Sequence, residues 1–514
     1  MGENVAALDM GTSTLAGAYK YGNSGRAISI EFGNGSGFCE AKLAFDENNQ
    51  PIIGADVDRA VAEGRIKPNK VIRNAKKLIG SEMVFSDAKG DVIRPEDAQA
   101  IFAKKVMEFI IAETHLKMED VTIVFTYPVS MKETAKELYL KALQTTGGFN
   151  VTSKHFYNEA LAALAGVSQE RGLDLNGKNV LIVDIGGGTT DIVEGTVVEK
   201  DGELTVVLRS LASDGQLGGT NYDIPVRNML VQTAQSIIPA VPASALCEDP
   251  AIKRESERIK RRLCDQQADQ DYAFSLSDGT VVSGTILYED FKTQTEDLTQ
   301  TVISVCQKAL DDAINDSDEN LQKLGLERMN SVDDLDMVVF VGGGSKVPSI
   351  REAMIQAWPQ LKDKINDSVD PQLVVSLGAA YLAGSSQIVS RAQGSYGARV
   401  RDSETNEVYG HIMIHHNDPL PATVKRVFYT PASTVCKTGL ISTKNWPREK
   451  GDHAPLLVCR PWGEVSLDTP EAIEGEEVQV EISMEQNGFV TFKATVNGRE
   501  TTVDFELADD VVMS

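Results

Sequence analysis

The sequence predicts a mixed α/β protein with two similar lobes around a cleft, followed by a small antiparallel β domain. One observation is the pattern D-x-G-x-x-T, which occurs at residues 9–14 and again at 184–189, each time between two apolar strand-like runs. Another is the alternation of strand-like and helix-like segments, which is typical of an α/β architecture. The third is a change at residues 385–400 to period-two runs separated by turn signals, which favours antiparallel sheets.

The two copies of the pattern are predicted to be hairpin turns that bind a polyphosphate. Each copy ends one apolar strand and begins another, and its glycines allow positive φ angles and close approach to the backbone. Successive amides in such a turn point inward as a nest that binds anions. Two facing hairpins would hold one polyphosphate between them. Asp9 and Asp184, ahead of the two turns, would hold a divalent cation through its waters, as Mg²⁺ prefers.

A third glycine loop lies in VVFVGGGSKVPSI, residues 338–350, between a β-branched strand and a helix-like segment. A strand, a glycine turn and a helix N-terminus together form a ready nucleotide contact. One such loop alone is as readily a plain turn, whereas three in one chain favour a nucleotide site.

The fixed order of these segments resembles the actin-like ATPase superfamily. The segments that carry this resemblance are, in chain order, the first hairpin, NEALAALAG (158–166), the second hairpin, VGGGSKVP (341–348) and VDPQLVVSLGAAYLAG (369–384). They look like that superfamily's phosphate, connecting and adenosine motifs.

Within the superfamily, the chain most resembles the 70-kDa heat-shock chaperone family of the DnaK type. The segments that carry the narrower resemblance are AKKLIG (75–80), FTYPVS (125–130), DGQLGGTNYD (214–223) and ERIKRRLC (257–264). They look like the family's catalytic-lysine segment, proline-switch strand, second-lobe glycine turn and adenine-binding helix. The resemblance covers residues 5 to about 386 and weakens beyond that point.

The resemblance implies two duplicated ribonuclease H-like lobes followed by a small antiparallel β-sandwich. The expected divisions are an actin-like nucleotide-binding domain at 1–386, with lobe I at about 1–183, lobe II at about 184–386 and a peripheral subdomain at about 225–310, then a linker at 387–396 and a substrate-binding-like β-sandwich at 397–514. The linker region lacks the family's acidic leucine run, and no helical lid is expected to cover the β-sandwich.

Composition excludes several classes of function. The chain has 514 residues, 42% of them hydrophobic and 24% charged, which suggests an ordinary globular protein of two to four domains. Its net charge of −25 argues against nucleic acid as a partner. Six scattered cysteines without C-x-x-C predict neither a zinc site nor a disulfide framework. Neither a signal peptide nor a membrane span is expected, so we predict a cytoplasmic protein with no membrane partner.

Phosphoryl transfer to water depends on positioning and charge neutralisation more than on covalent chemistry. The expected catalytic residues are Lys76, Glu159, Asp184, Thr189 and Asp191, and the expected ligands of hydrated Mg²⁺ are Asp9, Asp184 and Asp191. By resemblance, Lys76 fixes the water and γ-phosphate, and Glu159 positions the water and reports to Pro128. The resemblance also suggests K⁺ as a second cation. Considered alone, Lys76 or Glu159 has about a one-in-three chance of being only a solvated surface charge.

A cradle of glycines and hydroxyls is expected to hold the ATP or ADP. The expected phosphate contacts are Gly11, Thr12, Ser13, Thr14, Gly186, Gly187, Gly188, Thr189, Gly218 and Gly219. The expected adenosine contacts are Glu257, Lys260, Arg261, Cys264, Gly342, Gly343, Gly344 and Ser345. An arginine can stack on adenine because its guanidinium is planar and weakly hydrated. Without the other motifs, residues 253–263 would indicate only a charged helix with i, i+4 pairs.

Four positions depart from the family's pattern. Ala160 stands where proline is usual, Cys264 where a serine contacts the nucleotide, Gln372 where an acidic residue is usual, and Lys77 where arginine is common. None of these changes removes a phosphate ligand, so ATP binding should survive, whereas affinity, hydrolysis rate and coupling would be altered.

One further cluster, His411, His415 and His416, suggests a metal site, because residues 411 and 415 share a face of a strand. No fourth ligand is evident nearby, so a strand that carries polar histidines is the preferred interpretation.

Three functional classes are consistent with the sequence. The preferred one is an ATPase chaperone that binds unfolded or extended apolar peptides at strand edges through backbone hydrogen bonds, served by a J-domain co-chaperone and a nucleotide exchange factor. The second is a nucleotide-gated adaptor or co-chaperone with little peptide cycling. The third is a small-molecule kinase, in which an aspartate would deprotonate a hydroxyl substrate. A filament-forming relative would have to accommodate the β domain between protomers.

Overall fold

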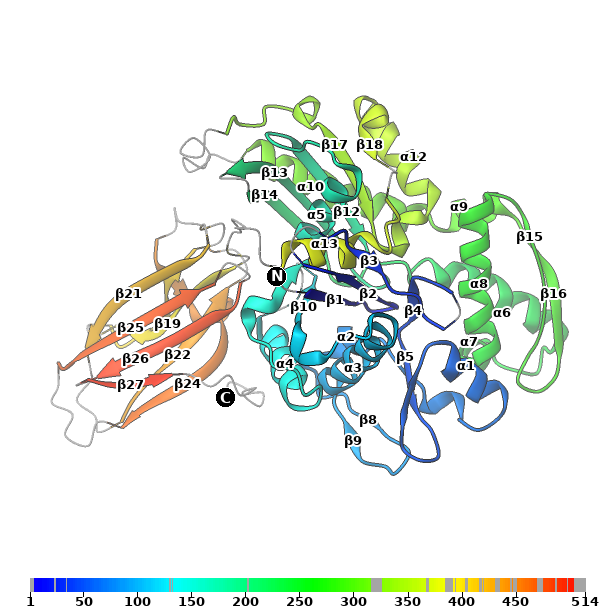
Figure 1. Ribbon diagram of the computed structural model, residues 1–514, viewed down its shortest axis with the longest axis horizontal. Helices are drawn as coiled ribbons and strands as arrows, with labels where there is room; N and C mark the ends of the chain where they lie inside the picture. The colour runs from blue at the N-terminus through cyan, green and yellow to red at the C-terminus, as the bar shows by residue number, and fades with distance from the viewer. Residues whose placement is uncertain are drawn as a thin grey trace.

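A two-lobed α/β body with a β domain beside it makes up the computed structural model of the chain (Figure 1). The structure describes residues 4–22, 25–33, 35–128, 131, 133–200, 203–315, 326–366, 369–383, 392, 394–402, 405–415, 418, 420–429, 435–443, 446, 451–468, 475–485, 488–496 and 498–502. Most of the expected linker therefore lies outside the described residues. Within them, no helix is both long and apolar enough to cross a membrane.

Lobe I is built on a mixed sheet with the strand order β11–β10–β1–β2–β3, in which β4 also pairs with β2. Its strands are β1 (Asn4–Met10), β2 (Thr14–Lys20), β3 (Ile28–Ser29), β4 (Phe38–Glu40), β10 (Val121–Tyr127) and β11 (Phe156–Asn158). The first two strands form an antiparallel hairpin, and β10 and β11 continue the sheet in parallel. The predicted first hairpin is therefore confirmed.

Smaller elements and helices surround this sheet. They are β5 (Lys42–Phe45), β6 (Pro51–Ile53), α1 (Ala55–Ala62), η1 (Pro68–Lys70), β7 (Ile72–Arg73), α2 (Ala75–Leu78), β8 (Phe85–Ser86), β9 (Val92–Ile93), α3 (Pro95–Thr114), η2 (Met118–Asp120), α4 (Glu133–Thr145), η3 (Ser153–His155) and α5 (Glu159–Arg171). Helix α3 begins with a proline and two acidic residues, which suit the first turn of a helix. Its buried face, which includes Phe102 and Val106, covers the sheet.

Lobe II repeats the topology of lobe I with the strand order β14–β13–β12–β17–β18. Its strands are β12 (Asn179–Ile185), β13 (Thr190–Lys200), β14 (Glu203–Asp214), β17 (Met337–Val341) and β18 (Ile365–Asn366). Again a hairpin, β12–β13, is followed by parallel strands. This repeat confirms the predicted fold of two duplicated lobes.

The remaining elements of lobe II lie around its sheet or at its periphery. They are α6 (Asp223–Ile237), α7 (Ala243–Glu248), α8 (Pro250–Gln266), β15 (Gln270–Ser275), β16 (Val281–Ile286), α9 (Tyr288–Gln294), α10 (Glu296–Ile314), η4 (Val332–Asp334), η5 (Gly343–Lys346), α12 (Pro348–Ala357), η6 (Pro359–Lys364) and α13 (Val374–Leu382). The peripheral elements, α6 to α9 with β15 and β16, are on the right of Figure 1. The antiparallel hairpin β15–β16 packs against α6 and α8.

Helices α5 and α13 lie between the two sheets and join them into one body (Figure 1). Alternate residues of β1 point to opposite faces, so Ala7 joins this shared core while Leu8 joins the core of lobe I. The two helices touch through their backbones at two glycines. A Cβ on Gly378 would overlap the carbonyl oxygen of Ala162, and a Cβ on Gly166 would overlap that of Val374. The glycines therefore set how closely the lobes approach.

The β domain is a sandwich of two antiparallel sheets, with strand orders β23–β20–β19–β22–β24 and β21–β25–β26–β27. Its elements are β19 (Ser395–Arg401), β20 (Val408–Ile414), β21 (Ala422–Tyr429), β22 (Val435–Thr443), β23 (His453–Pro455), η8 (Leu456–Val458), β24 (Arg460–Asp468), β25 (Glu477–Met484), β26 (Val490–Val496) and β27 (Arg499–Thr502). Residues Tyr396, Leu440, Ile482 and Phe492 pack between the sheets. The predicted antiparallel β domain is confirmed for the described residues.

The β domain contacts lobe I through the turn between β25 and β26. The ring of Phe489 lies 5.5 Å from that of Phe156 in β11, centroid to centroid, and is buried in the core of lobe I. Beside it, burial and then the charge of Glu485 raise the pKa of Glu137 on α4 to about 7, against a smaller opposing effect of Lys136. A carboxyl group that titrates near neutrality therefore lies at the contact between the two domains.

We expect Glu137→Gln to stabilise the protein more at pH 8 than at pH 5. The folded pKa lies above the ordinary value of 4.5, so the protonated form stabilises the fold, and this stabilisation is lost as the pH rises through about 7. At pH 8 the gain should be about 1–2 kcal/mol after allowance for partial exposure, or a few degrees in Tm. Thermal melts at both pH values measure it, with the exposed Glu82→Gln as control. An equal Tm difference at the two pH values would contradict this account.

Candidate functional site

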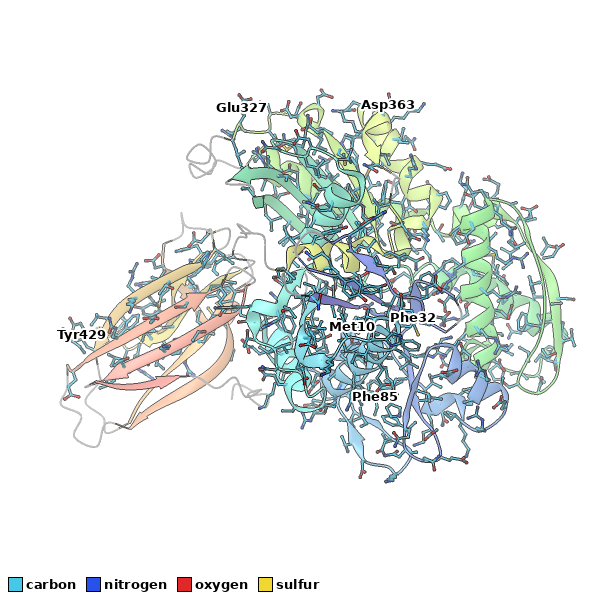
Figure 2. All side chains as sticks on the ribbon, in the orientation of Figure 1. Met10, Phe32, Phe85, Glu327, Asp363 and Tyr429 are labelled. Atoms are coloured by element: carbon cyan, nitrogen blue, oxygen red, sulfur yellow. The ribbon has the colours of Figure 1, made fainter. Side chains whose placement is uncertain are left out.

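The two glycine hairpins lie against each other where the lobes meet, close to Met10 at the end of β1 (Figure 2). A Cβ on Gly187 would overlap the Ser13 hydroxyl of the first hairpin. Within the second hairpin, the Gly186 amide donates to the carbonyl of Thr189 at 2.9 Å. Gly187 is required because any side chain at this position would push the two hairpins apart. We call the region where the two hairpins meet the cradle; successive amides of such turns can form an anion nest.

The second-lobe glycine turn, within residues 214–223, packs against the second hairpin. A Cβ on Gly218 would lie 2.5 Å from the amide nitrogen of Gly188. The Gly219 amide donates to the carbonyl of Gly186 at 2.9 Å, and the Gly218 amide donates to the side chain of Asn221, also at 2.9 Å. The turn predicted from DGQLGGTNYD is therefore held directly behind the second hairpin. In the first hairpin, a Cβ on Gly11 would lie 2.5 Å from the carbonyl oxygen of Thr14.

A lysine and a glutamate form a buried ion pair beside the cradle. Lys76 lies on the single-turn helix α2, is only 7% exposed, and approaches Glu159 with 2.7 Å between Nζ and Oε1. Glu159 begins α5, whose N-cap residue Asn158 accepts a hydrogen bond from the Ala160 amide. A carboxylate in the first turn is favoured by the helix dipole. The Ala160 departure thus leaves an amide donor where proline would have none.

Three aspartates share this buried space. Asp184 and Asp191 face each other across the β12–β13 hairpin, and Asp9 accepts a hydrogen bond of 2.8 Å from the Thr126 hydroxyl. Burial, and then Glu159, Asp191 and Asp9, raise the pKa of Asp184 well above its ordinary range. Burial alone would lower the pKa of Lys76, but Glu159 and Asp9 raise it, so the lysine keeps its proton.

The balance of charge in this space is negative, because four carboxyl groups surround one ammonium. Burial raises the pKa of Asp9 and of Glu159, while Lys76 opposes both shifts. A divalent cation would relieve the repulsion, so the donor set fits the expected Mg²⁺. Among the described residues, no group of three or more histidines, cysteines, aspartates or glutamates is arranged to hold a metal directly. An ion held through its own waters is the form that Mg²⁺ prefers.

The third glycine loop packs on the second hairpin. Gly342 has a φ of 78°, a value that favours glycine, and its amide donates to the carbonyl of Pro371 at 2.8 Å. A Cβ on Gly344 would lie 2.6 Å from Cγ2 of Ile185. The Ser345 hydroxyl donates to the carbonyl of Gly342 at 2.7 Å. The loop between β17 and α12 is therefore built as predicted, with Gly343 beside Gln372.

A cavity of about 410 Å³ opens between this loop and the end of α8. Its lining residues are Cys264, Asp265, Gln267, Phe340, Ser345, Lys346, Val347, Pro348, Arg351, Glu352, Asn366, Val369 and Pro371. Of the expected adenosine contacts, Cys264 and Ser345 line it. Lys346, Arg351 and Asn366 were missed by the sequence analysis. Lys346 flanks the glycine loop, a signal that could have found it, whereas Arg351 and Asn366 stand in no motif.

Three charged residues expected at the adenosine form ion pairs in this structure. Lys260 forms an ion pair with Asp223, with 2.7 Å between Nζ and Oδ1, and donates to the Gly219 carbonyl at 3.0 Å. Arg261 pairs with Glu257 at 2.6 Å and lies 3.8 Å from Glu40 of lobe I. Lys260 therefore joins α8 to the second-lobe turn and Arg261 joins it to lobe I, whereas Glu257 pairs within α8. None of the three lines the cavity described above.

The histidines of the β domain form a polar cluster. His411 pairs across the sheet with His453, and the rings lie 5.7 Å apart. His415 Nε2 lies 3.1 Å from Asp452 Oδ1. His416 lies outside the described residues. Among the residues that are described, these histidines belong to no group of three or more side chains that could hold a metal ion.

The chain is similar in sequence to known proteins. A family model described as Hsp70 protein matches residues 47–508. Similar proteins include heat shock 70 kDa protein BIP3 of Oryza sativa subsp. japonica, 27% identical over 74% of this chain and 56% of that protein. Chaperone protein DnaK of Mesomycoplasma hyopneumoniae is 25% identical over 98% of this chain and 78% of its own length. Chaperone protein dnaK1 of Prochlorococcus marinus is 23% identical over 97% and 74% respectively.

We expect Asp184→Asn to stabilise the protein in buffer without Mg²⁺ or nucleotide at pH 8. Burial, and then the neighbouring carboxylates, raise the pKa of Asp184 and so make its ionised form costly in the folded protein, and asparagine removes this ionisable group. The free energy of unfolding should rise by about 1 kcal/mol, and Tm with it. The same variant should lose most of the further rise in Tm that Mg²⁺ with ATP gives the wild type. A lower Tm than wild type, with Asp312→Asn on the exposed face of α10 as control, would refute this expectation.

Proposed function

Because the chain belongs to the 70-kDa heat-shock protein family, we propose that it binds and hydrolyses ATP and couples the nucleotide state to peptide binding by its β domain. The observation that carries the proposal is the meeting of two glycine hairpins, one from each lobe, beside the buried Lys76–Glu159 pair. Positioning and charge neutralisation of this kind are what phosphoryl transfer needs.

In this proposal the hairpins bind the phosphates and the buried charges orient water. Amides and hydroxyls at residues 11–14 and 186–189 hold phosphate oxygens. Lys76, kept protonated by its carboxylate neighbours, donates to the γ-phosphate and to the attacking water, and Glu159 accepts from that water. Asp9, Asp184 and Asp191 would hold the hydrated Mg²⁺, which would supply neutralisation of phosphate charge. Water adds to the γ-phosphorus, the bond to the β-phosphate oxygen breaks, and the water's proton leaves with the phosphate or the ADP.

The β domain offers an edge to an extended peptide. Strand β21 lies at one edge of its sheet and pairs only with β25 among the described strands. Val427 and Tyr429 on this strand are 48% and 65% exposed, and Figure 2 shows Tyr429 at the end of the β domain remote from the lobes. An added strand would gain backbone hydrogen bonds along such an edge. We propose unfolded, apolar segments as the peptides, with a J-domain co-chaperone and a nucleotide exchange factor as further partners in the cytoplasm.

One observation favours the alternative of a slow, nucleotide-gated adaptor. Lys260 and Arg261 are held by carboxylates, and the cavity near Ser345 has Cys264 and Lys346 on its walls. An altered adenosine pocket would lower turnover or change affinity without removing the phosphate cradle. The two functions differ in whether peptide changes the hydrolysis rate.

Single-turnover hydrolysis of ATP tests the proposal. We expect slow hydrolysis that an unfolded apolar peptide accelerates and that Lys76→Ala reduces by about 100-fold or more, because the loss of one positioned donor to a developing charge costs that much. Lys67→Ala, at an exposed lysine, is the matched control. Hydrolysis that is indifferent to peptide would favour the adaptor. Failure of the wild type to bind ATP would refute both functions.

A further inference from the structure

A second lysine of α2 crosses the cleft between the lobes. Lys76 and Lys77 are consecutive, so their side chains leave this short helix in different directions. Whereas Lys76 is buried against Glu159, the end of the Lys77 side chain lies against Gly188 in the second hairpin. A Cβ on Gly188 would overlap Cε of Lys77 and lie 2.5 Å from its Nζ. The ammonium thus reaches from lobe I to the phosphate cradle of lobe II.

The Lys77 ammonium has no anionic partner in the described part of the chain. None of the hydrogen bonds and ion pairs among the described residues involves its Nζ. Burial lowers the pKa of Lys77, and the more distant charge of Asp214 offsets this shift only in part. A cation beside a nest of amides, without a carboxylate to bind, is suited to the same anion that the amides bind.

We propose that Lys77 is a further phosphate-binding residue, whose ammonium contacts the polyphosphate of the nucleotide from the lobe opposite the second hairpin. This inference rests on the proposed ATP site and adds a residue to it. An ammonium is a compact charge with three donors, so it can bind phosphate oxygens without the fixed fork of an arginine. Because Lys77 belongs to lobe I and Gly188 to lobe II, the contact links the lobes when they are closed on the phosphates.

The negative charges around the cradle explain why a second ammonium would favour phosphate binding. Asp9, Glu159, Asp184 and Asp191 supply four carboxyl groups, and Lys76 already pairs with one of them, Glu159, at 2.7 Å. A polyphosphate adds further negative charge to that space, so a second ammonium lowers the electrostatic cost of binding. Gly188 has a matching role, since any side chain at this position would displace the lysine.

Equilibrium binding tests the proposal without relying on turnover. Titration calorimetry with Mg²⁺·ATP, Mg²⁺·ADP and adenosine would compare the wild type with Lys77→Met, which keeps the aliphatic contact on Gly188 and removes the charge. We expect about 10- to 100-fold weaker binding of ATP, as for the loss of a charged hydrogen bond, and unchanged binding of adenosine. The salt dependence of ATP binding should fall as well, because one cation fewer meets the phosphates.

Two controls and two outcomes make the result decisive. Lys77→Arg keeps the charge and should stay within a few-fold of wild type, and Lys67→Ala should bind normally, with thermal melts verifying that each variant is folded. Wild-type affinity for ATP in Lys77→Met would overturn this inference alone and leave the proposed ATPase intact. Absence of ATP binding by the wild type would overturn the proposed function and this inference together.

Discussion

Contact between backbones, made possible by glycine, is the constraint on which the rest of this structure depends. Helices α5 and α13 can lie together between the two sheets only because Gly166 and Gly378 have no side chains. That separation in turn sets the distance between the hairpins, where Gly187 meets Ser13. Close packing of this kind tolerates little added volume, so side chains at these glycines would push the lobes apart. The phosphate cradle is therefore a consequence of how the lobes are joined.

The residues around the cradle carry more carboxyl groups than the buried Lys76 ammonium can neutralise. Burial raises the pKa of Asp9, and burial followed by the charges of neighbouring carboxylates raises the pKa of Asp184. Such a site gains stability from a bound cation, because the charge of the cation offsets that of the carboxylates. The β domain is connected to the same region. Phe489 packs on Phe156 in β11, and that strand ends one residue before Glu159, so the contact between the domains lies close in the chain to the buried ion pair.

Local sequence signals predicted much of the fold and the centre of the site. Both hairpins and the loop at Gly342 could be found because strand, glycine and strand or helix follow one another within a few residues. Long-range partners left no such signal. The capture of Lys260 by Asp223, the approach of Arg261 to Glu40, and the position of Arg351 on the cavity wall depend on how segments far apart in the chain pack. The insertion of Phe489 into the core of lobe I likewise depends on the placement of a whole domain.

The most direct test of the central claim is the affinity for Mg²⁺·ATP of a variant with one added methyl group where the hairpins meet. Gly187→Ala would place a Cβ on the Ser13 hydroxyl, whereas Gly215→Ala places one in open space. If backbone contact between the lobes forms the phosphate cradle, Gly187→Ala should weaken binding by about tenfold or more, and Gly215→Ala should bind like the wild type. Equal, wild-type affinity in both folded variants would contradict the account.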